Sequence, residues 1–167
     1  MTDMAEHFPD FSPSDSAITS TRIRRLVAYW ESRRNGRPVP LRDDIDPAAI
    51  RDLLPLLLIA EIEEPFRVRY RLVGTRVVEF NRLDFTGTYL DEMRWDSSER
   101  YTRAYHAVVA SGLPHYGLDS WPLSNDTDGR SEIVMLPLSS SGARIDRCLG
   151  LEDFFFSPLD LRRQASS

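Results

Sequence analysis

The clearest pattern in the chain is a strict alternation of apolar and basic residues in its middle, RVRYRLV. Val68, Tyr70 and Leu72 alternate there with arginines, which is typical of a half-buried β-strand. The alternation ends at Gly74, and a short apolar helical turn and a polar loop up to Gly87 follow. A strand, a glycine break, a short helix and a polar loop in this order predict one wall of a small-molecule pocket.

A second strand is predicted just before the alternating one, over 56–63, with a proline-containing turn between the antiparallel partners. We expect Glu61 and Glu63 to lie opposite the arginines, where each exposed cross-strand pair contributes about 0.2–1 kcal/mol. This pairing is preferred over binding of an anion by the arginine stripe. A short helix is predicted from Asp46, which can cap it, until the proline at position 55 ends it.

Near the N-terminus, a longer helix is predicted over 15–34, with a cap among Ser14, Asp15 and Ser16 and a stop at Asn35. Its apolar residues recur at i, i+3, i+4 and i+7 and form one stripe. The stripe consists of Ile23, Leu26, Val27 and Trp30. Such a stripe must cover either the sheet of its own domain or a second copy of the chain, which would make the protein a homodimer.

The second half of the chain predicts one helix and three strands. The helix begins at Ser97 or Ser98 and ends at Gly112, and the strands lie over about 115–123, 132–138 and 146–156, joined by glycine-bearing hairpin loops. The pattern as a whole predicts an α+β domain on one five-stranded antiparallel sheet. The helices between the second and third strands are expected to pack on one face of that sheet, with the pocket between them and the sheet.

The predicted organisation is a single domain with short extensions. Residues 1–13 are expected to be a flexible segment, 14–36 the N-terminal helix, 37–156 the core and 157–167 a polar tail. Hydrophobic residues make up 41% and charged residues 28%, as in ordinary globular proteins, and no apolar run reaches the roughly 20 residues of a membrane helix. A single cysteine, Cys148, and an N-terminus unlike a secretory signal predict a cytoplasmic protein.

Charge and residue usage exclude several functions. Every basic residue is an arginine, so a phosphate loop with its lysine, a Schiff-base lysine and a Ser–Lys dyad are impossible. The net charge of −5 argues against nucleic-acid or anionic-membrane partners.

Four stretches carry a resemblance to a known family. They read YWESRRNGRPVPLRDDIDPAAIRDLLP at 29–55, YRLVGTRVVEFNRLDFTG at 70–87, LPL at 136–138 and DRCLG at 146–150. On these residues the chain resembles the stand-alone bacterial subfamily of PAS domains, over roughly 23–155. The resemblance implies a sheet in PAS order, a ligand or interaction cleft, dimerisation through an N-terminal helix and no catalytic residue. Asn81 departs from the subfamily motif, which commonly has a glycine there.

Pocket candidates follow from the expected wall. Asn81 and Asp84 come just after the short helix, where polar side chains can orient a ligand. The apolar candidates for the pocket, which would otherwise be core residues, are Tyr70, Leu72, Val78, Phe80, Tyr105, Val109, Leu136 and Leu149. Two histidines, His106 on the long helix and His115 at the start of a strand, complete the set.

Cofactor chemistry is disfavoured by the same residues. Some PAS sensors bind haem through a histidine on the long helix, but His106 lies near the edge of the apolar face, where a partly exposed histidine without haem is expected. Flavin photochemistry is disfavoured because Cys148 lies in a late strand. No two of the three histidines have metal-ligand spacing.

The function predicted from the sequence is that of a cytoplasmic PAS-type sensory or regulatory protein, not an enzyme. It would bind an unidentified small molecule or partner protein and signal through protein–protein interaction. One alternative is a ligand-free docking scaffold. Another is a small α+β isomerase or dehydratase, in which Glu79, Asp84 and His106 could approach one another; solvated carboxylates are the simpler interpretation.

Overall fold

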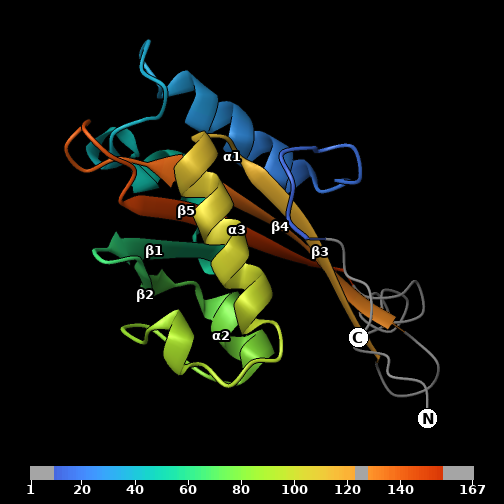
Figure 1. Ribbon diagram of the computed structural model, residues 1–167. Coiled ribbons are helices and arrows are strands. Elements are labelled where there is room, and N and C mark those ends of the chain that lie inside the picture. The colour runs from blue at the N-terminus through green and yellow to red at the C-terminus, as the bar shows by residue number, and fades with distance from the viewer. Residues whose placement is uncertain (1–9, 123–127, 156–167) are drawn as a thin grey trace.

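The computed structural model of the protein describes residues 10–122 and 128–155, and its centre is one antiparallel sheet (Figure 1). The strands are β1 (Leu57–Glu63), β2 (Arg67–Val73), β3 (His115–Pro122), β4 (Asp128–Leu138) and β5 (Arg147–Phe155). They lie in the order β2-β1-β5-β4-β3, with every neighbouring pair antiparallel. The predicted α+β class with a five-stranded antiparallel sheet is confirmed.

Helices cover both faces of the sheet. They are α1 (Thr21–Ser32), α2 (Thr75–Asn81) and α3 (Ser98–Ser111), with the 3-10 segments η1 (Arg42–Asp44), η2 (Pro47–Leu56) and η3 (Leu90–Glu92). The helices between β2 and β3 share one hydrophobic cluster with one face, and Figure 1 shows α3 crossing in front of the strands. The other face forms a second cluster with α1 and η2.

The N-terminal helix packs on its own sheet. Ile23, Leu26 and Trp30 are at most 1% exposed and belong to the second cluster, and half-buried Val27 packs against it. The Trp30 indole N–H also donates a hydrogen bond to the Pro137 carbonyl at 2.8 Å. The stripe therefore covers this domain and would have to leave the sheet to contact a second copy.

Helix α1 begins later than predicted, at Thr21, because the chain before it is held by side chains of the sheet. Ser20 is the N-cap, and its hydroxyl accepts a hydrogen bond from the Ile23 amide at 3.0 Å. The fully buried Glu132 carboxylate accepts hydrogen bonds from the amides of Thr19 and Ser20. These contacts fix residues 19–20 as an extended anchor instead of a helical turn.

Two further local predictions need correction. Pro55 does not end the short helix, because η2 runs on to Leu56 as a kinked 3-10 segment; Asp46 caps its start as expected, accepting from the Ala48 amide at 3.0 Å. Residues 10–12 are not loose: Ser12 pairs with Tyr116 at the edge of β3, and Phe11 is buried. The predictions for 1–9, for most of the 124–129 loop and for the 157–167 tail lie outside the described residues.

The alternation of β2 breaks at Arg71, before the end at Gly74 that the sequence pattern indicates. Ile59 pairs with Leu72 but the next residue of β1 pairs with Tyr70, so Arg71 is an extra residue, a β-bulge. The bulge turns Leu72 away from the pocket face and leaves it 40% exposed. Leu72 is therefore not a pocket residue. The register does place Glu61 opposite Arg69, as predicted.

Leu136 and Leu149 lie on the opposite side of the sheet from the predicted pocket. Both are buried in the cluster beneath α1, whereas Met135 and Cys148 of the same strands belong to the cluster beneath α3. Their assignment to the pocket was wrong because strands buried on both faces are continuously apolar and carry no alternation that reveals the orientation of a side chain.

Candidate functional site

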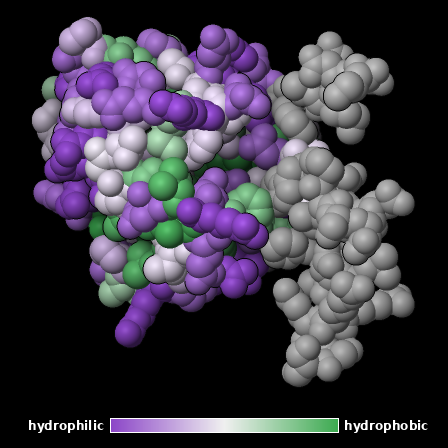
Figure 2. All heavy atoms as spheres, turned by 90° about the horizontal axis from the view of Figure 1, so that it is seen from below, coloured by the Kyte–Doolittle hydropathy of each residue, from purple (hydrophilic) through white to green (hydrophobic). Residues whose placement is uncertain are grey.

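A cavity of about 710 Å³ lies between α2, α3 and the face of the sheet that they cover. Its volume falls within the range of small-molecule sites, roughly 300–1,000 Å³. Residues from the N-terminal segment, β1, β2, α2, α3, β3, β5 and the connection between α2 and α3 line it. Seen from below, the surface of the molecule is mainly hydrophilic, with apolar side chains gathered near its centre (Figure 2).

Three aromatic rings form one wall of the cavity. Tyr70 of β2 and Phe85 meet edge to face with ring centroids 4.9 Å apart, and Phe85 meets Trp95 in the same way at 5.0 Å. Edge-to-face pairs are favourable and hold rings in fixed orientations. The wall is therefore a preformed surface on which an apolar group can pack. We call these three residues the aromatic wall.

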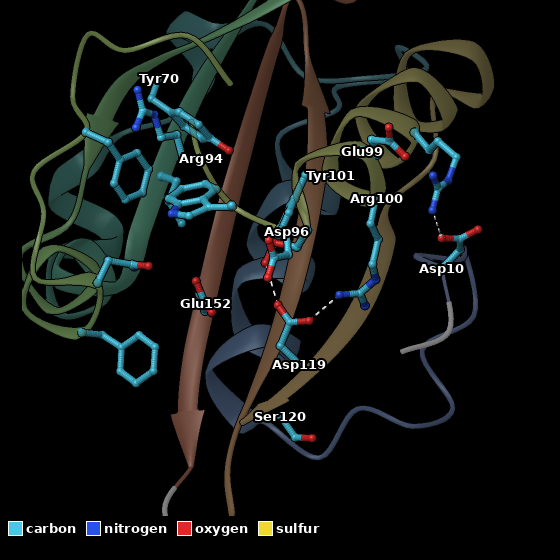
Figure 3. A pocket seen from close by; sticks show the side chains of 17 residues that line it. Asp10, Tyr70, Arg94, Asp96, Glu99, Arg100, Tyr101, Asp119, Ser120 and Glu152 are labelled. Atoms are coloured by element: carbon cyan, nitrogen blue, oxygen red, sulfur yellow. Dashed lines mark hydrogen bonds and ion pairs between the residues drawn. The ribbon is translucent and has the colours of Figure 1, made fainter. Parts of the chain in front are cut away.

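The opposite wall carries an ion pair between α3 and β3. Arg100 donates to Asp119 Oδ1 and, at 2.8 Å, to the Leu118 carbonyl, and the Tyr101 hydroxyl donates to Asp119 Oδ2 at 2.7 Å. Figure 3 shows Arg100 and Tyr101 both directed at Asp119. Arg100 is only 9% exposed, so this pair is largely shielded from water. Both oxygens of Asp119 are thus occupied by protein donors.

Glu152 of β5 lies on the floor between these walls (Figure 3). Its Oε1 accepts a hydrogen bond from the Ser131 hydroxyl at 2.8 Å. The pKa of the Glu152 carboxyl is raised to about 7: burial is the main cause, the hydrogen bond from Ser131 opposes it, and the charge of Asp119 adds a smaller increase. The cavity therefore holds an acid that changes its charge near neutral pH.

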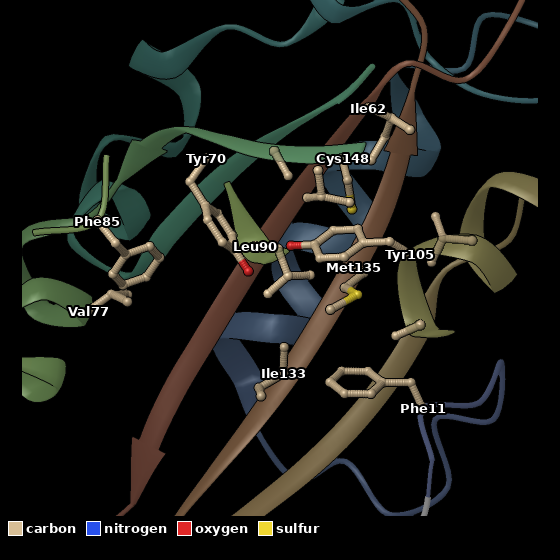
Figure 4. Close-up of a cluster of buried hydrophobic side chains, with 14 residues drawn as sticks. Phe11, Ile62, Tyr70, Val77, Phe85, Leu90, Tyr105, Ile133, Met135 and Cys148 are labelled. Carbon is tan, nitrogen blue, oxygen red and sulfur yellow. The ribbon is translucent and has the colours of Figure 1, made fainter. Parts of the chain in front are cut away.

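Behind the aromatic wall, Tyr70 contacts a second buried tyrosine, Tyr105. The Tyr105 and Tyr70 hydroxyls share a hydrogen bond, and the two side chains point toward each other in Figure 4. Burial raises the pKa of both phenols, so both stay protonated. Tyr105 belongs to the hydrophobic core behind the wall and does not line the cavity itself.

The N-terminal segment completes the rim. Asp10 lines the cavity and forms an ion pair with Arg103 of α3 at 2.9 Å. The Phe11 ring lies 5.4 Å from the Tyr101 ring and 4.7 Å from the Arg100 guanidinium. Arg100 and Tyr101, which donate hydrogen bonds to Asp119, therefore also contact Phe11 of the N-terminal segment.

Three of the predicted pocket residues, Tyr70, Phe80 and Asn81, line the cavity. Asn81 uses its amide group to donate to the Val77 carbonyl at 2.8 Å. Asp84 is exposed and accepts from the Thr86 amide and hydroxyl, which lowers the pKa of its carboxyl, so it serves a turn and not the pocket.

The remaining predicted residues lie elsewhere. His106 is exposed and stacks on the Phe66 ring at 3.5 Å, and His115 is buried with Nδ1 3.0 Å from the Leu113 carbonyl. Val109 of α3 is half-buried and packs against the core cluster, and Val78 is half-buried on α2. Because Glu79 also lies outside the lining, the acid–base group considered for an enzyme does not assemble in the cavity.

Sequence reasoning missed the polar centre of the site. Arg100 lies four residues before Ala104 and eight before Val108, at the spacing of the buried face of α3, which is a signal for a buried charge. Glu152 follows an apolar strand segment, and a carboxylate there is unusual. For Phe85 and Trp95, in a polar connection, the sequence offers no comparable signal.

Within the described ranges, no group of three or more histidine, cysteine or acidic residues has the arrangement of a metal site. Cys148 is buried, and burial raises the pKa of its thiol to about 12. No helix among the described residues is long and apolar enough to span a membrane.

Comparison with known proteins identifies the class of this fold. The profile of the PAS domain family matches residues 18–152, most of the chain, and the chain belongs to this family. PAS domains are in general sensory or regulatory modules. The chain is also similar to the solved structure of an RNA-binding light-oxygen-voltage receptor, with 12% identity and a TM-score of 0.46, covering 95% of this chain and 41% of that one. No curated protein matches.

Proposed function

We propose that this PAS domain is a cytoplasmic sensor whose cavity binds a small molecule and whose ligand state is passed on to a partner protein. The observation that carries the proposal is the cavity itself, in which a rigid aromatic wall faces a largely buried ion pair across an acid floor. Apolar walls with a few fixed polar groups are the usual construction of a ligand site. The single buried cysteine fits a reducing compartment.

The contacts of the cavity support a route for the signal. Arg100 and Tyr101 both line the cavity, and both also contact the ring of Phe11. A ligand that prefers one arrangement of these side chains would shift the population of positions of the N-terminal segment. A homodimer built on the apolar stripe of α1 would first have to expose Leu26 and Trp30, so we place the signalling surface at residues 10–12 instead.

The test is the mass of the purified protein under native and then denaturing conditions. We expect a native mass excess that denaturation removes. We also expect Trp95→Ala to lose it, because Trp95 is the outer ring of the aromatic wall. Leu83→Ala, which shortens an exposed side chain outside the cavity, should retain it. A wild-type mass equal to that of the chain alone would favour the docking scaffold.

A further inference from the structure

The lining of the cavity has an excess of negative charge. Five acids and three arginines contribute to it. Arg100 is paired with Asp119, and Arg103 with Asp10, so the charge of each of these two guanidinium groups is already matched by one carboxylate. Arg94, Asp96 and Glu99 are all exposed, where water screens their charges, so Glu152 is the one acid of the lining that is neither exposed nor paired with an arginine among the described residues. The charge that the protein leaves unbalanced in the cavity is therefore negative.

Glu152 is the half-buried acid of the lining whose negative charge is left unbalanced. Within the part of the chain that the structure describes, no ion pair reaches its carboxylate, and its hydrogen-bond donor is the neutral Ser131 hydroxyl. Asp119, the nearest acid, has both oxygens occupied and adds its own charge to the environment of Glu152. A carboxylate taken out of water beside a second acid is favoured by a cation placed next to it.

The aromatic wall is close enough to act on the same ligand. Glu152 lines the same cavity as the three residues of the aromatic wall, so one ligand can contact both the carboxylate and the rings. Ring faces carry negative electrostatic potential and attract cations within about 6 Å. Figure 3 shows Glu152 on β5 between the side chains of Tyr70 and Asp119.

We propose that the ligand of the cavity is an organic cation, a protonated amine whose ammonium group contacts Glu152 and whose apolar body packs on the aromatic wall. This inference rests on the proposed function and names the chemical class of the ligand. An organic anion would be repelled by Glu152 and Asp119. Among the arginines of the lining, only the exposed Arg94 has no ion pair with another lining acid. A neutral ligand would leave the Glu152 carboxylate without compensation.

The test compares three probes of nearly equal shape: phenethylamine, 2-phenylethanol and 3-phenylpropionate. Binding is measured by calorimetry at about pH 8.5, where the Glu152 carboxyl is ionised and the amine still protonated. The amine is expected to bind at least about tenfold more tightly than the alcohol, as for a charge-assisted contact. Glu152→Gln is expected to remove this difference in affinity. Glu79 is an exposed acid outside the cavity, so Glu79→Gln is expected to keep the difference.

A second readout separates contact with Glu152 from a structural effect of the substitution. At about pH 6 most of the carboxyl carries a proton, so amine binding should release close to one proton, seen as an enthalpy that depends on the buffer. Glu152→Gln should release none.

Equal binding of amine and alcohol, tighter binding of the acid, or a preference for the amine over the alcohol that survives in Glu152→Gln would overturn the cation proposal. If the alcohol or acid binds and Trp95→Ala weakens that binding, the ligand site stands and only the ligand class is wrong. If no probe binds, the ligand class is also rejected. The mass measurement then decides the proposed function separately.

Discussion

The Ser131 hydroxyl of β4 donates a 2.8 Å hydrogen bond to the Glu152 carboxylate of β5, and this contact joins two strands on the floor of the cavity. The hydrogen bond favours the ionised acid, yet the pKa of Glu152 is raised to about 7. A neutral hydrogen bond contributes about 0.5–1.5 kcal/mol, whereas a shift of this size corresponds to about 3 kcal/mol. Desolvation therefore outweighs the hydrogen bond at this position.

The first prediction concerns pH. The folded protein holds the Glu152 proton more tightly than the unfolded chain, whose value is 4.5, so stability from this group is lost as the pH rises from about 4.5 to about 7. At about pH 8 the Glu152→Gln variant should be more stable than the wild type by about 2–3 kcal/mol. Urea unfolding across this pH range measures it. Parallel pH profiles of the two proteins would show that Glu152 does not titrate in the folded state.

The second prediction concerns the ion pair across the cavity. Asp119→Asn should destabilise the fold by about 2–4 kcal/mol, because it leaves the mostly buried guanidinium of Arg100 without its counter-charge. Asp52→Asn is the matched control: its partner is Arg25, and both side chains are more than half exposed, so little or no loss of stability is expected. Chemical denaturation compares the two. Equal losses would place the Asp119 pair among ordinary surface contacts.

The third prediction concerns the glycine at the start of α2. A Cβ on Gly74 would lie 2.3 Å from the Pro55 carbonyl oxygen, and backbone cannot move aside as a side chain does. Gly74→Ala should therefore cost about 3 kcal/mol or more, as for a severe overpacking change. At Gly150 the nearest atom would be 3.5 Å away, an ordinary contact, so Gly150→Ala should be tolerated far better. Thermal unfolding of both variants tests the difference, and a Gly74→Ala protein as stable as Gly150→Ala would contradict the packing of α2 on η2.

The fourth prediction separates the two roles considered for the N-terminal helix. Leu26→Ala should lower stability by about 2–4 kcal/mol, because the side chain is fully buried against the sheet. The native mass of the variant, measured by light scattering, should equal that of the wild type. Val27→Ala, at a half-buried neighbour, should cost less. A Leu26→Ala variant that keeps its stability but changes its oligomeric state would show instead that the apolar stripe of α1 is a dimer interface.

Much of the fold could be read from local patterns. The bounds of β2 and the end of α3 at Gly112 agree with the prediction, because alternation and a left-handed glycine cap are properties of a few neighbouring residues. The face of Leu72 could not be read in this way, since the bulge that turns it outward belongs to the pairing of β2 with β1. The same holds for Leu136, whose strand is apolar on both sides.

The candidate site was predicted less completely than the fold. Tyr70, Phe80 and Asn81 lie in the stretch that the alternation and the short helix marked as a pocket wall. Glu152 and Asp119 come from strands far along the chain, and nothing in either local pattern connects them.

By itself, the sequence determined the elements of this protein, their order and a pocket beside the strand that contains Tyr70, because periodicity, capping residues and turns act over a few residues. Only the tertiary structure decided which side of each buried strand meets that pocket, where α1 packs, and that Glu152 lies on the floor between the aromatic wall and the ion pair. The physical reason is that burial and charge imbalance depend on all the segments packed around a group, and these meet only when the sheet has formed.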